Sequence, residues 1–452
     1  MGIILRLRTE IGNTDVTVPS APPNDHGFGT ERRRVAVIGA GISGLASAYL
    51  LSSRHDVTLY ESAAYLGGHS NTVDVTIGDV SHPVDTGFLV YNERTYPNLV
   101  RLFAELGVRA HRSEMSFGVS LDDGRTEWAG TNLDSVFAQR RNLVSPGFLG
   151  MLGDIMRFNR DAEANLAAAR ISGITLGELL ERGAYGLRFR EAYLLPMVAA
   201  IWSGARQDVV KFPAESFLQF ALNHGLLQLT DRPQWLTVDG GSRRYVGLLR
   251  SHLRDVRTET PVRSARRDGG RVAVATDRGT ETFDAVVFGT HAPTTLRLLA
   301  DARPDEHAVL APVRYQTNVA VLHRDPRLLP RRRKVWSAWN YLGRSAEGQF
   351  GPVCVSYLIN KLQPIPFADP IIVTLNPFVD PDPALEFARF EYEHPVLDAG
   401  ALSAQRHLAS VQGRHQAWFA GAWTGYGFHE DGLKSALRVA AALGAAPTWA
   451  VL

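Results

Sequence analysis

The feature that most constrains the fold is a glycine-rich turn between an apolar strand and a helix. Residues 34–38 (RVAVI) predict a fully buried parallel strand, and Gly39–Gly44 (GAGISG) follow it directly. Ile42–Ser53 then predicts a helix and His55–Tyr60 a second strand, which completes one β-α-β unit. The three glycines of such a turn permit the tight bend, the approach of a pyrophosphate and close helix–strand packing. The segment therefore predicts a Rossmann-like domain that binds a dinucleotide.

A carboxylate at the end of the second strand narrows the choice of dinucleotide. Glu61 lies 20 residues after Gly41, where its side chain can accept hydrogen bonds from both ribose hydroxyls. An acid at this position disfavours a 2′-phosphate, so NADP is a poor candidate. NAD and FAD both remain compatible with this segment alone.

Strand-like segments of the same style return twice later in the chain, which indicates that the nucleotide domain is discontinuous. They are Arg271–Thr276, Ala285–Gly289 and Gln416–Gly421, the last followed by a predicted helix at Gly432–Leu443. Between them, residues 95–230 look mainly helical and residues 313–400 mix strands with Pro-rich turns. We predict an α/β fold with a discontinuous Rossmann-like nucleotide domain and an interleaved α+β substrate domain. The predicted boundaries are 1–33 for a flexible N-terminal extension, 34–94, 232–300 and 401–447 for the nucleotide domain, and 95–231 and 301–400 for the substrate domain.

Composition excludes several other classes of protein. The 452 residues carry 48 Lys and Arg against 46 Asp and Glu, and a net charge of +2 creates no global field for nucleic acid. The single cysteine, Cys354, excludes an intrachain disulfide and a zinc site built from cysteines, and it fits a cytoplasmic protein. No apolar stretch approaches the length of a membrane span, and no signal peptide is predicted. We therefore expect no nucleic acid partner and no metal.

Further motifs, in their order along the chain, favour FAD over NAD. Gly67-Gly68-His69 follows Glu61 after five residues, and Val84–Phe88 (VDTGF) comes next. The last block reads Trp418–Gly421 (WFAG) and then Gly432–Ala436 (GLKSA). This ordered set resembles the amine oxidase, protoporphyrinogen oxidase and phytoene desaturase superfamily of FAD enzymes. The stretches GGHSNTVDV, DTGFLVYNERTYPNL, NHGLLQLTDRPQW and GYGFHEDGL are most similar to bacterial NAD/FAD-binding proteins associated with cyclopropane-fatty-acid-synthase-type methyltransferases.

The resemblance implies FAD as cofactor and a set of residues that contact it. Two positions depart from the superfamily pattern. Ala422 stands where an acid usually binds the ribityl chain, and residues 315–321 contain no lysine for a water-mediated contact to flavin N5, Asn318 being the nearest match. The missing lysine disfavours an efficient, oxygen-consuming amine oxidase. The implied FAD-binding residues are Gly39, Gly41, Ile42, Ser43, Gly44, Glu61, Gly67, Gly68, His69, Asp85, Thr86, Gly87, Val262, Gly421, Ala422, Asp431, Gly432 and Leu433.

Candidate catalytic residues cluster beside these motifs. His429 follows the last flavin-contacting strand, and an unperturbed histidine, with a pKa of about 6.5, exchanges protons near neutrality. Glu430 could tune it, and Tyr91 and Glu93 follow the Asp-Thr-Gly turn and could line the same cavity. The alternatives are a structural His429, acids that only complement a helix N-terminus, and a surface turn at 91–94.

Together these features predict an FAD-dependent oxidoreductase acting on an apolar, unsaturated fatty-acyl or other lipid chain. The reaction would be desaturation, saturation or double-bond isomerisation by hydride transfer at flavin N5. The alternatives are a flavin amine oxidase and an FAD-binding accessory subunit of a lipid methyltransferase. An apolar helical face at 148–156 and the basic, Trp-containing run 331–339 predict peripheral contact with the inner face of the membrane, or else core packing and a solvated loop.

Overall fold

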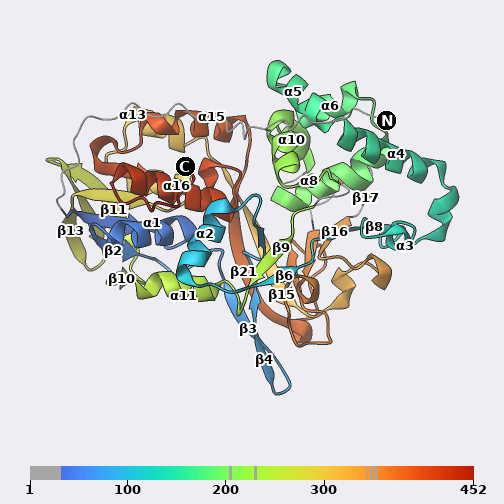
Figure 1. The fold of residues 1–452 in the computed structure, drawn as a ribbon, viewed down its shortest axis with the longest axis horizontal. Helices are drawn as coiled ribbons and strands as arrows, with labels where there is room; N and C mark the ends of the chain where they lie inside the picture. Colours follow the sequence, from blue (N-terminus) through green and yellow to red (C-terminus); the bar gives the residue numbers. More distant parts are fainter. Residues whose placement is uncertain (1–31, 203–205, 229–231, 344, 347–348, 351–353) are drawn as a thin grey trace, which may run out of the picture.

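The computed structural model describes residues 32–202, 206–228, 232–343, 345–346, 349–350 and 354–452 (Figure 1). Residues 1–31 of the expected N-terminal extension lie outside the described residues. None of the described helices is long and apolar enough to cross a membrane.

The cofactor side of the molecule is a five-stranded parallel sheet built from three separate stretches of chain. Its order is β10-β2-β1-β14-β22, and every neighbouring pair is parallel. The expected discontinuous α/β architecture is therefore confirmed. The strands are β1 (Arg34–Ile38), β2 (Asp56–Tyr60), β10 (Asp255–Arg257), β14 (Ala285–Phe288) and β22 (Ala417–Phe419).

Two helices meet at the carboxyl end of this sheet, α1 (Ile42–Ser52) and α16 (His429–Ala442). A side chain at Gly432 would place its Cβ 2.8 Å from Ile42 Cγ2, so glycine lets the helices pack closely. The expected start of α16 at Gly432 was three residues too late. Asp431 accepts from the Phe428 backbone N–H and closes a capping box, which puts residues 429–431 in the first turn.

Smaller elements flank this sheet. An antiparallel three-stranded sheet contains β11 (Val262–Asp268), β12 (Arg271–Thr276) and β13 (Gly279–Phe283). A second three-stranded sheet contains β5 (Tyr91–Asn92), β9 (Trp235–Val238) and β6 (Ala110–Ser113). The remaining elements near it are β3 (Thr72–Ile77), β4 (Val80–Asp85), α2 (Pro97–Leu106), α11 (Arg243–Ser251), α12 (Ala292–Leu298), α13 (Pro304–Leu310) and α15 (Ala399–His407).

The substrate side is built on a seven-stranded mixed sheet of order β21-β15-β20-β19-β16-β7-β8. Residues 95–230 are mainly helical, as expected, but this stretch also contributes strands β7 and β8 to the sheet. Both strands are short and derive their stability from pairing with β16 and with each other rather than from a long local pattern. The strands are β7 (Phe117–Leu121), β8 (Thr126–Ala129), β15 (Tyr315–His323), β16 (Trp339–Gly343), β19 (Cys354–Leu358), β20 (Ile372–Leu375) and β21 (Glu386–Pro395).

A group of helices completes this side and lies at the upper right of Figure 1. The apolar face expected to touch a membrane belongs to α4, and Phe148, Met151 and Ile155 of that face are buried in the core. Core packing therefore accounts for these three residues, whereas Leu149 and Met156 of the same run are exposed. The helices include α4 (Pro146–Arg160), α5 (Ala162–Ser172), α6 (Leu176–Arg182), α8 (Leu195–Trp202), α9 (Arg206–Lys211) and α10 (Ala214–Asn223).

The basic run at 331–334, the second candidate for membrane contact, is exposed, and two of its four side chains form ion pairs. Arg332 Nη1 lies 2.6 Å from the carboxylate of Glu127, which is completely buried. Lys334 pairs with Asp134 at 2.8 Å. These two ion pairs anchor the run to the β7–β8 hairpin and to the residues that follow it.

Candidate active site

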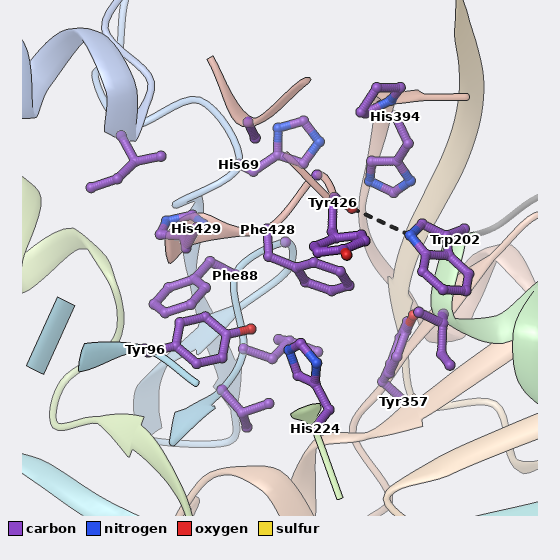
Figure 2. A pocket seen from close by; sticks show the side chains of 18 of the residues that line it. His69, Phe88, Tyr96, Trp202, His224, Tyr357, His394, Tyr426, Phe428 and His429 are labelled. Atoms are coloured by element: carbon purple, nitrogen blue, oxygen red, sulfur yellow. Dashed lines mark hydrogen bonds between the residues drawn. The ribbon is translucent and has the colours of Figure 1, made fainter. Parts of the chain in front are cut away.

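A cavity of about 860 Å³ runs between the two sides of the molecule. The glycine turn after β1 lines one end, and side chains from α8, α10, β16 and β19 line the other. The two ends differ in chemistry: backbone and small residues at the first, aromatic and aliphatic side chains at the second. Figure 2 shows the aromatic side chains and histidines that converge where the ends meet.

The first end has the space and the donors that a dinucleotide needs. Gly41 faces open space, since a Cβ built on it would meet no atom within 4 Å. Gly44 is different, because its Cβ would lie 1.7 Å from the Gly39 carbonyl oxygen, so any side chain there breaks the packing of α1 on the turn. Glu61 Oε2 accepts from the Ala40 backbone N–H at 2.7 Å, which holds the carboxylate beside the turn. These residues fit a dinucleotide.

His69 adds a polar atom with no partner at this end. It follows Gly67-Gly68, lines the cavity, and its buried Nε2 has no hydrogen-bond partner among the described residues. Burial, with three neighbouring histidines, holds the pKa of His69 well below its usual value, so the ring is neutral. A buried nitrogen left unpaired is costly, which fits a bound group that supplies its partner.

The residues implied to bind FAD divide into two groups. Those of the first group line the large cavity: Gly39, Gly41, Ile42, Ser43, Glu61, Gly67, Gly68, His69, Gly87, Gly421 and Ala422. Val262 lines a smaller pocket of about 330 Å³ with Gly39, Tyr60 and Ser62. The structure places the others behind the cavity wall: Gly44, Asp85, Thr86, Asp431, Gly432 and Leu433.

Two of the residues behind the wall are carboxylates that organise the loops in front of them. Asp85 is buried and accepts from Thr72, from Gln363 and from both the backbone and the side chain of Ser242. Asp431 accepts from the Tyr426 and Phe428 backbone N–H groups, and burial raises its pKa to about 6. Neither carboxylate lines the cavity, so each can act on a ligand only through the groups that it holds.

His429 lies at the cavity wall, as expected, but in a tightly held position. Its Nε2 is 2.9 Å from both Ser70 Oγ and Tyr245 Oη, and its ring stacks on Phe88 with 3.7 Å between centroids. Burial lowers the pKa of His429 to about 3. The expectation of a pKa near 6.5 was therefore wrong, because the sequence does not show that folding removes the His429 ring from water.

The other three candidate catalytic residues do not reach the cavity. Glu430 is buried, and its carboxylate accepts from the Asn98 and Leu99 backbone N–H groups, which caps the N-terminus of α2. Tyr91 packs in the core, where burial raises its pKa to about 12, and Glu93 is exposed on the following turn. The structure thus brings His429 to the site without Glu430, Tyr91 or Glu93.

The second end of the cavity is a box of aromatic rings. Phe220 stacks on Phe428 at 4.9 Å between centroids and packs against Trp202 at 4.8 Å. Trp202 Nε1 donates to the Tyr426 carbonyl at 3.3 Å, shown dashed in Figure 2, so its polar atom is satisfied. Tyr193, Met197 and Ile201 extend the apolar lining. Such a surface binds an apolar chain by burial rather than by polar contacts.

The carboxylates that line the described cavity are all engaged by protein groups. Glu114 accepts from Lys361 at 3.0 Å, and Glu393 lies 2.9 Å from His291 Nδ1. Glu61 is bound to the backbone N–H groups of Ala40 and Ala63. All three carboxylates therefore accept hydrogen bonds from the protein, and Glu114 is also paired with the cation of Lys361.

Several residues of the site were not anticipated from sequence. Tyr96, Trp202, Tyr426, His291 and His394 all line the cavity. For His394 a signal was present: along β21 exposed acids alternate with Phe390, Tyr392 and His394, which is the pattern of a half-buried strand. Asn318, the nearest sequence match to the missing lysine, is completely buried behind the wall.

Comparison with known proteins agrees with this geometry. Carotenoid phi-ring synthase from Streptomyces griseus is 29% identical over 309 residues, covering 63% of this chain, and the match spans only 57% of the length of that relative. The solved structure of a CLA-producing fatty acid isomerase from P. acnes matches with a TM-score of 0.62 at 14% identity, covering 89% of this chain and 97% of that one. Cyclohexylamine oxidase from Brevibacterium oxydans matches with a TM-score of 0.64 at 16% identity, covering 91% and 99%.

The similar solved structures establish the fold, and a match to a sequence family establishes the family to which the chain belongs. Residues 42–327, well over half of the chain, match the flavin containing amine oxidoreductase family. The match begins directly after Gly41, in the turn that the cavity exposes. The chain therefore belongs to the flavin containing amine oxidoreductase family, and its cofactor is FAD.

Proposed function

We propose that this FAD-dependent oxidoreductase acts on an apolar, unsaturated fatty-acyl or related lipid chain. The reaction would be desaturation, saturation or double-bond isomerisation. The observation that carries the proposal is the aromatic end of the cavity, in which Trp202, Phe220 and Phe428 form a continuous apolar wall. Burying an apolar chain against such a wall contributes about 25 cal/mol for each Å² removed from water.

The electrostatics of the cavity support an uncharged reacting segment. Each lining carboxylate already accepts a hydrogen bond from the protein, and His69 and His429 are neutral because desolvation lowers their pKa values. When bound, FAD supplies the two-electron acceptor and donor for a hydride. The chain would bind and orient the substrate, and the aromatic wall would exclude water from the reacting carbon.

The names of two similar proteins support the same substrate class. A fatty acid isomerase shares the fold, and a carotenoid phi-ring synthase shares sequence over part of its length. Fatty acids and carotenoids are both long apolar molecules. This support is by analogy, and the site itself has to be tested.

An amine oxidase is the second candidate, and one observation favours it. The rings of Trp202, Tyr426 and Phe428 lie near one another in the cavity, and aromatic faces attract ammonium groups. The engaged carboxylates disfavour it, because an amine entering the cavity would have to compete with the protein groups that already bind them. An accessory subunit that binds a lipid methyltransferase is a third proposal, which turnover by the isolated chain would exclude.

The decisive experiment mixes purified holoenzyme with oleate, with linoleate or with benzylamine in the absence of oxygen. Flavin absorbance and the lipid products, analysed by mass spectrometry, are followed together. We expect a change in the fatty acid: a moved double bond with the flavin oxidised at the end, or an added double bond with the flavin left reduced. Saturation would appear when the flavin is reduced beforehand. Bleaching by benzylamine with both fatty acids unchanged would establish the amine oxidase instead.

A further inference from the structure

Three hydrogen bonds form a chain behind the cavity wall. The donor and the acceptor in each bond follow from the chemistry of the groups alone. This chain of bonds starts at the Val319 backbone N–H, which can only donate, and which lies 3.0 Å from Asn376 Oδ1. With Oδ1 used as acceptor, the Asn376 amide presents Nδ2, which donates to Asn318 Oδ1 at 2.8 Å. The orientation of both amides therefore follows from one backbone group, and a flipped amide would set two donors against each other.

The last bond of this chain reaches the cavity. Asn318 Nδ2 lies 3.1 Å from His394 Nδ1 and also donates to the Gln316 carbonyl. Because Asn318 Nδ2 is a donor, His394 Nδ1 must be the acceptor, and a neutral ring then carries its proton on Nε2. Strand register produces this meeting, since Asn318 lies opposite Tyr392 and His394 lies opposite Gln316 on β15 and β21.

The protonated nitrogen of His394 is the one left for the cavity. The ring lines the cavity beside His69, with 5.2 Å between the ring centroids (Figure 2). No described residue bonds to His394 Nε2. Burial and nearby His291 lower the pKa of His394 to about 4, so the ring remains neutral at physiological pH. The rings of His291 and His69 beside it are neutral as well, because burial lowers both of their pKa values, and the Glu393 carboxylate lies 2.9 Å from His291 Nδ1.

We propose that His394 presents Nε2–H as a fixed hydrogen-bond donor to an acceptor atom of FAD or of the substrate, and that Asn318, braced by Asn376, is the positioning residue that sets this tautomer. A ring with a free choice of tautomer would offer a donor only part of the time, whereas this arrangement offers one permanently. The substrate part rests on the proposed function. The tautomer does not, because it follows from the protein alone.

The first experiment measures the tautomer directly in the holoenzyme with ¹⁵N-labelled histidine, by long-range ¹⁵N–¹H correlation at pH 7. His394→Gln identifies the signal by its loss. We expect an Nε2–H ring in the native protein and an Nδ1–H or charged ring in Asn318→Asp, since a carboxylate can only accept. Buried His323 is the internal control: its Nδ1 accepts from the Asp325 N–H at 3.0 Å, so its Nε2–H tautomer should persist in both proteins.

Two results would overturn the proposal at this stage. One is a native His394 that is charged or protonated on Nδ1, and the other is a tautomer that Asn318→Asp leaves unchanged. If Asn318→Asp fails to retain FAD, Asn318→Leu replaces it, because a residue that neither donates nor accepts should leave a mixture of tautomers. A pure Nε2–H ring in Asn318→Leu would equally exclude the positioning role.

The second experiment finds the acceptor. If it belongs to FAD, Asn318→Asp should shift the visible flavin bands of the substrate-free holoenzyme, while His394→Gln, which keeps an N–H donor, shifts them less. If it belongs to the substrate, the bands stay and the Kd for oleate rises about tenfold in Asn318→Asp, the size of one lost hydrogen bond. If neither the flavin bands nor the Kd for oleate changes, the proposed donor is refuted. Failure of oleate to bind the native protein would refute the proposed substrate and leave the tautomer result standing.

Discussion

The two ends of the cavity are built by different means. At the cofactor end the lining is mainly backbone and small residues, most of them between Gly39 and His69, with Gly87, Gly421 and Ala422 added from elsewhere in the chain. At the apolar end they come from single side chains on α8, α10, β16, β19 and the loop before α16, which are distant in sequence. A mutation that moves the backbone of the cofactor end, here called the cradle, should remove the ligand. The aromatic side chains of the apolar end, here called the wall, can be replaced one at a time.

This difference predicts separable effects of mutation. Changes in the cradle should remove FAD, and everything that depends on FAD should disappear with it. Changes in the wall should leave FAD in place and alter only the binding and turnover of the second molecule. The following variants test that separation.

The largest effect should come from Gly44→Ala. Its Cβ would lie 1.7 Å from the Gly39 carbonyl, so α1 has to move off the turn, and we expect protein purified without FAD and with lower stability. The flavin-to-protein absorbance ratio measures the loss. Gly153→Ala is the matched control, because it lies in α4 with no atom within 4 Å of its Cβ and should stabilise the protein by about 0.5–1 kcal/mol. Full FAD content in Gly44→Ala would contradict the cradle.

Glu61→Ala should weaken FAD binding rather than abolish it. The carboxylate braces the turn through Ala40, and we expect it also to bind the ribose, so a charge-assisted hydrogen bond worth roughly 1.5–3 kcal/mol is lost. That loss corresponds to about a 10- to 150-fold rise in the Kd for FAD. Titration of the apoprotein with FAD measures it, and an unchanged Kd would show that the turn holds the cofactor without Glu61.

Trp202→Ala should leave FAD content unchanged and weaken binding of the apolar substrate. Removing this ring from the wall forfeits roughly 1.5–3 kcal/mol of burial, so kcat/KM for a fatty acid that is turned over should fall about 10- to 100-fold. Trp449→Ala is the control, since that ring lies outside the cavity and donates to Glu105. Equal effects of the two variants would mean that the substrate does not use the aromatic wall.

The smallest effect concerns pH. Burial lowers the pKa values of His224 and His323 to about 4, so the unfolded chain binds more protons between pH 4 and 6.5. The stability that the folded protein keeps by holding these two histidines neutral is fully present above pH 6.5 and is lost as the pH falls towards 4. The carboxyls of Asp85, Glu430 and Asp431, whose pKa values burial raises, act in the opposite sense. His394 and His429, with lowered pKa values, act in the same sense as His224 and His323.

We therefore expect the free energy of unfolding to decrease on acidification from pH 6.5 to 4. His224→Phe should flatten this slope by up to about 1.4 kcal/mol per pH unit, because one proton less is taken up on unfolding. Urea denaturation at pH 7.5, 6 and 5 measures the slopes. Parallel slopes for the variant and the native protein would show that water in the cavity already solvates His224.

Much of the cofactor end could be anticipated from sequence, but the catalytic candidates could not. The turn at 39–44 and the carboxylate of Glu61 occupy the expected places because they form one local β-α-β unit. Glu430 was assigned next to His429 by adjacency, yet adjacent helical residues point in different directions, and Glu430 turns to α2 while His429 turns to the cavity. Asn318 was aligned with a cofactor contact and instead acts on His394 from behind the wall.

The sequence alone therefore indicated the dinucleotide-binding turn, because its geometry is set by residues close together in the chain, and the ordered motifs from Gly67 to Ala436 indicated FAD. Only the tertiary structure decided which side chains share the cavity and how each is charged. His394 meets Asn318 across 76 residues through the register of two strands, and His429 loses its ordinary pKa through burial by elements far away in sequence. Such properties belong to the packed environment, since desolvation and hydrogen-bond direction depend on every neighbour at once.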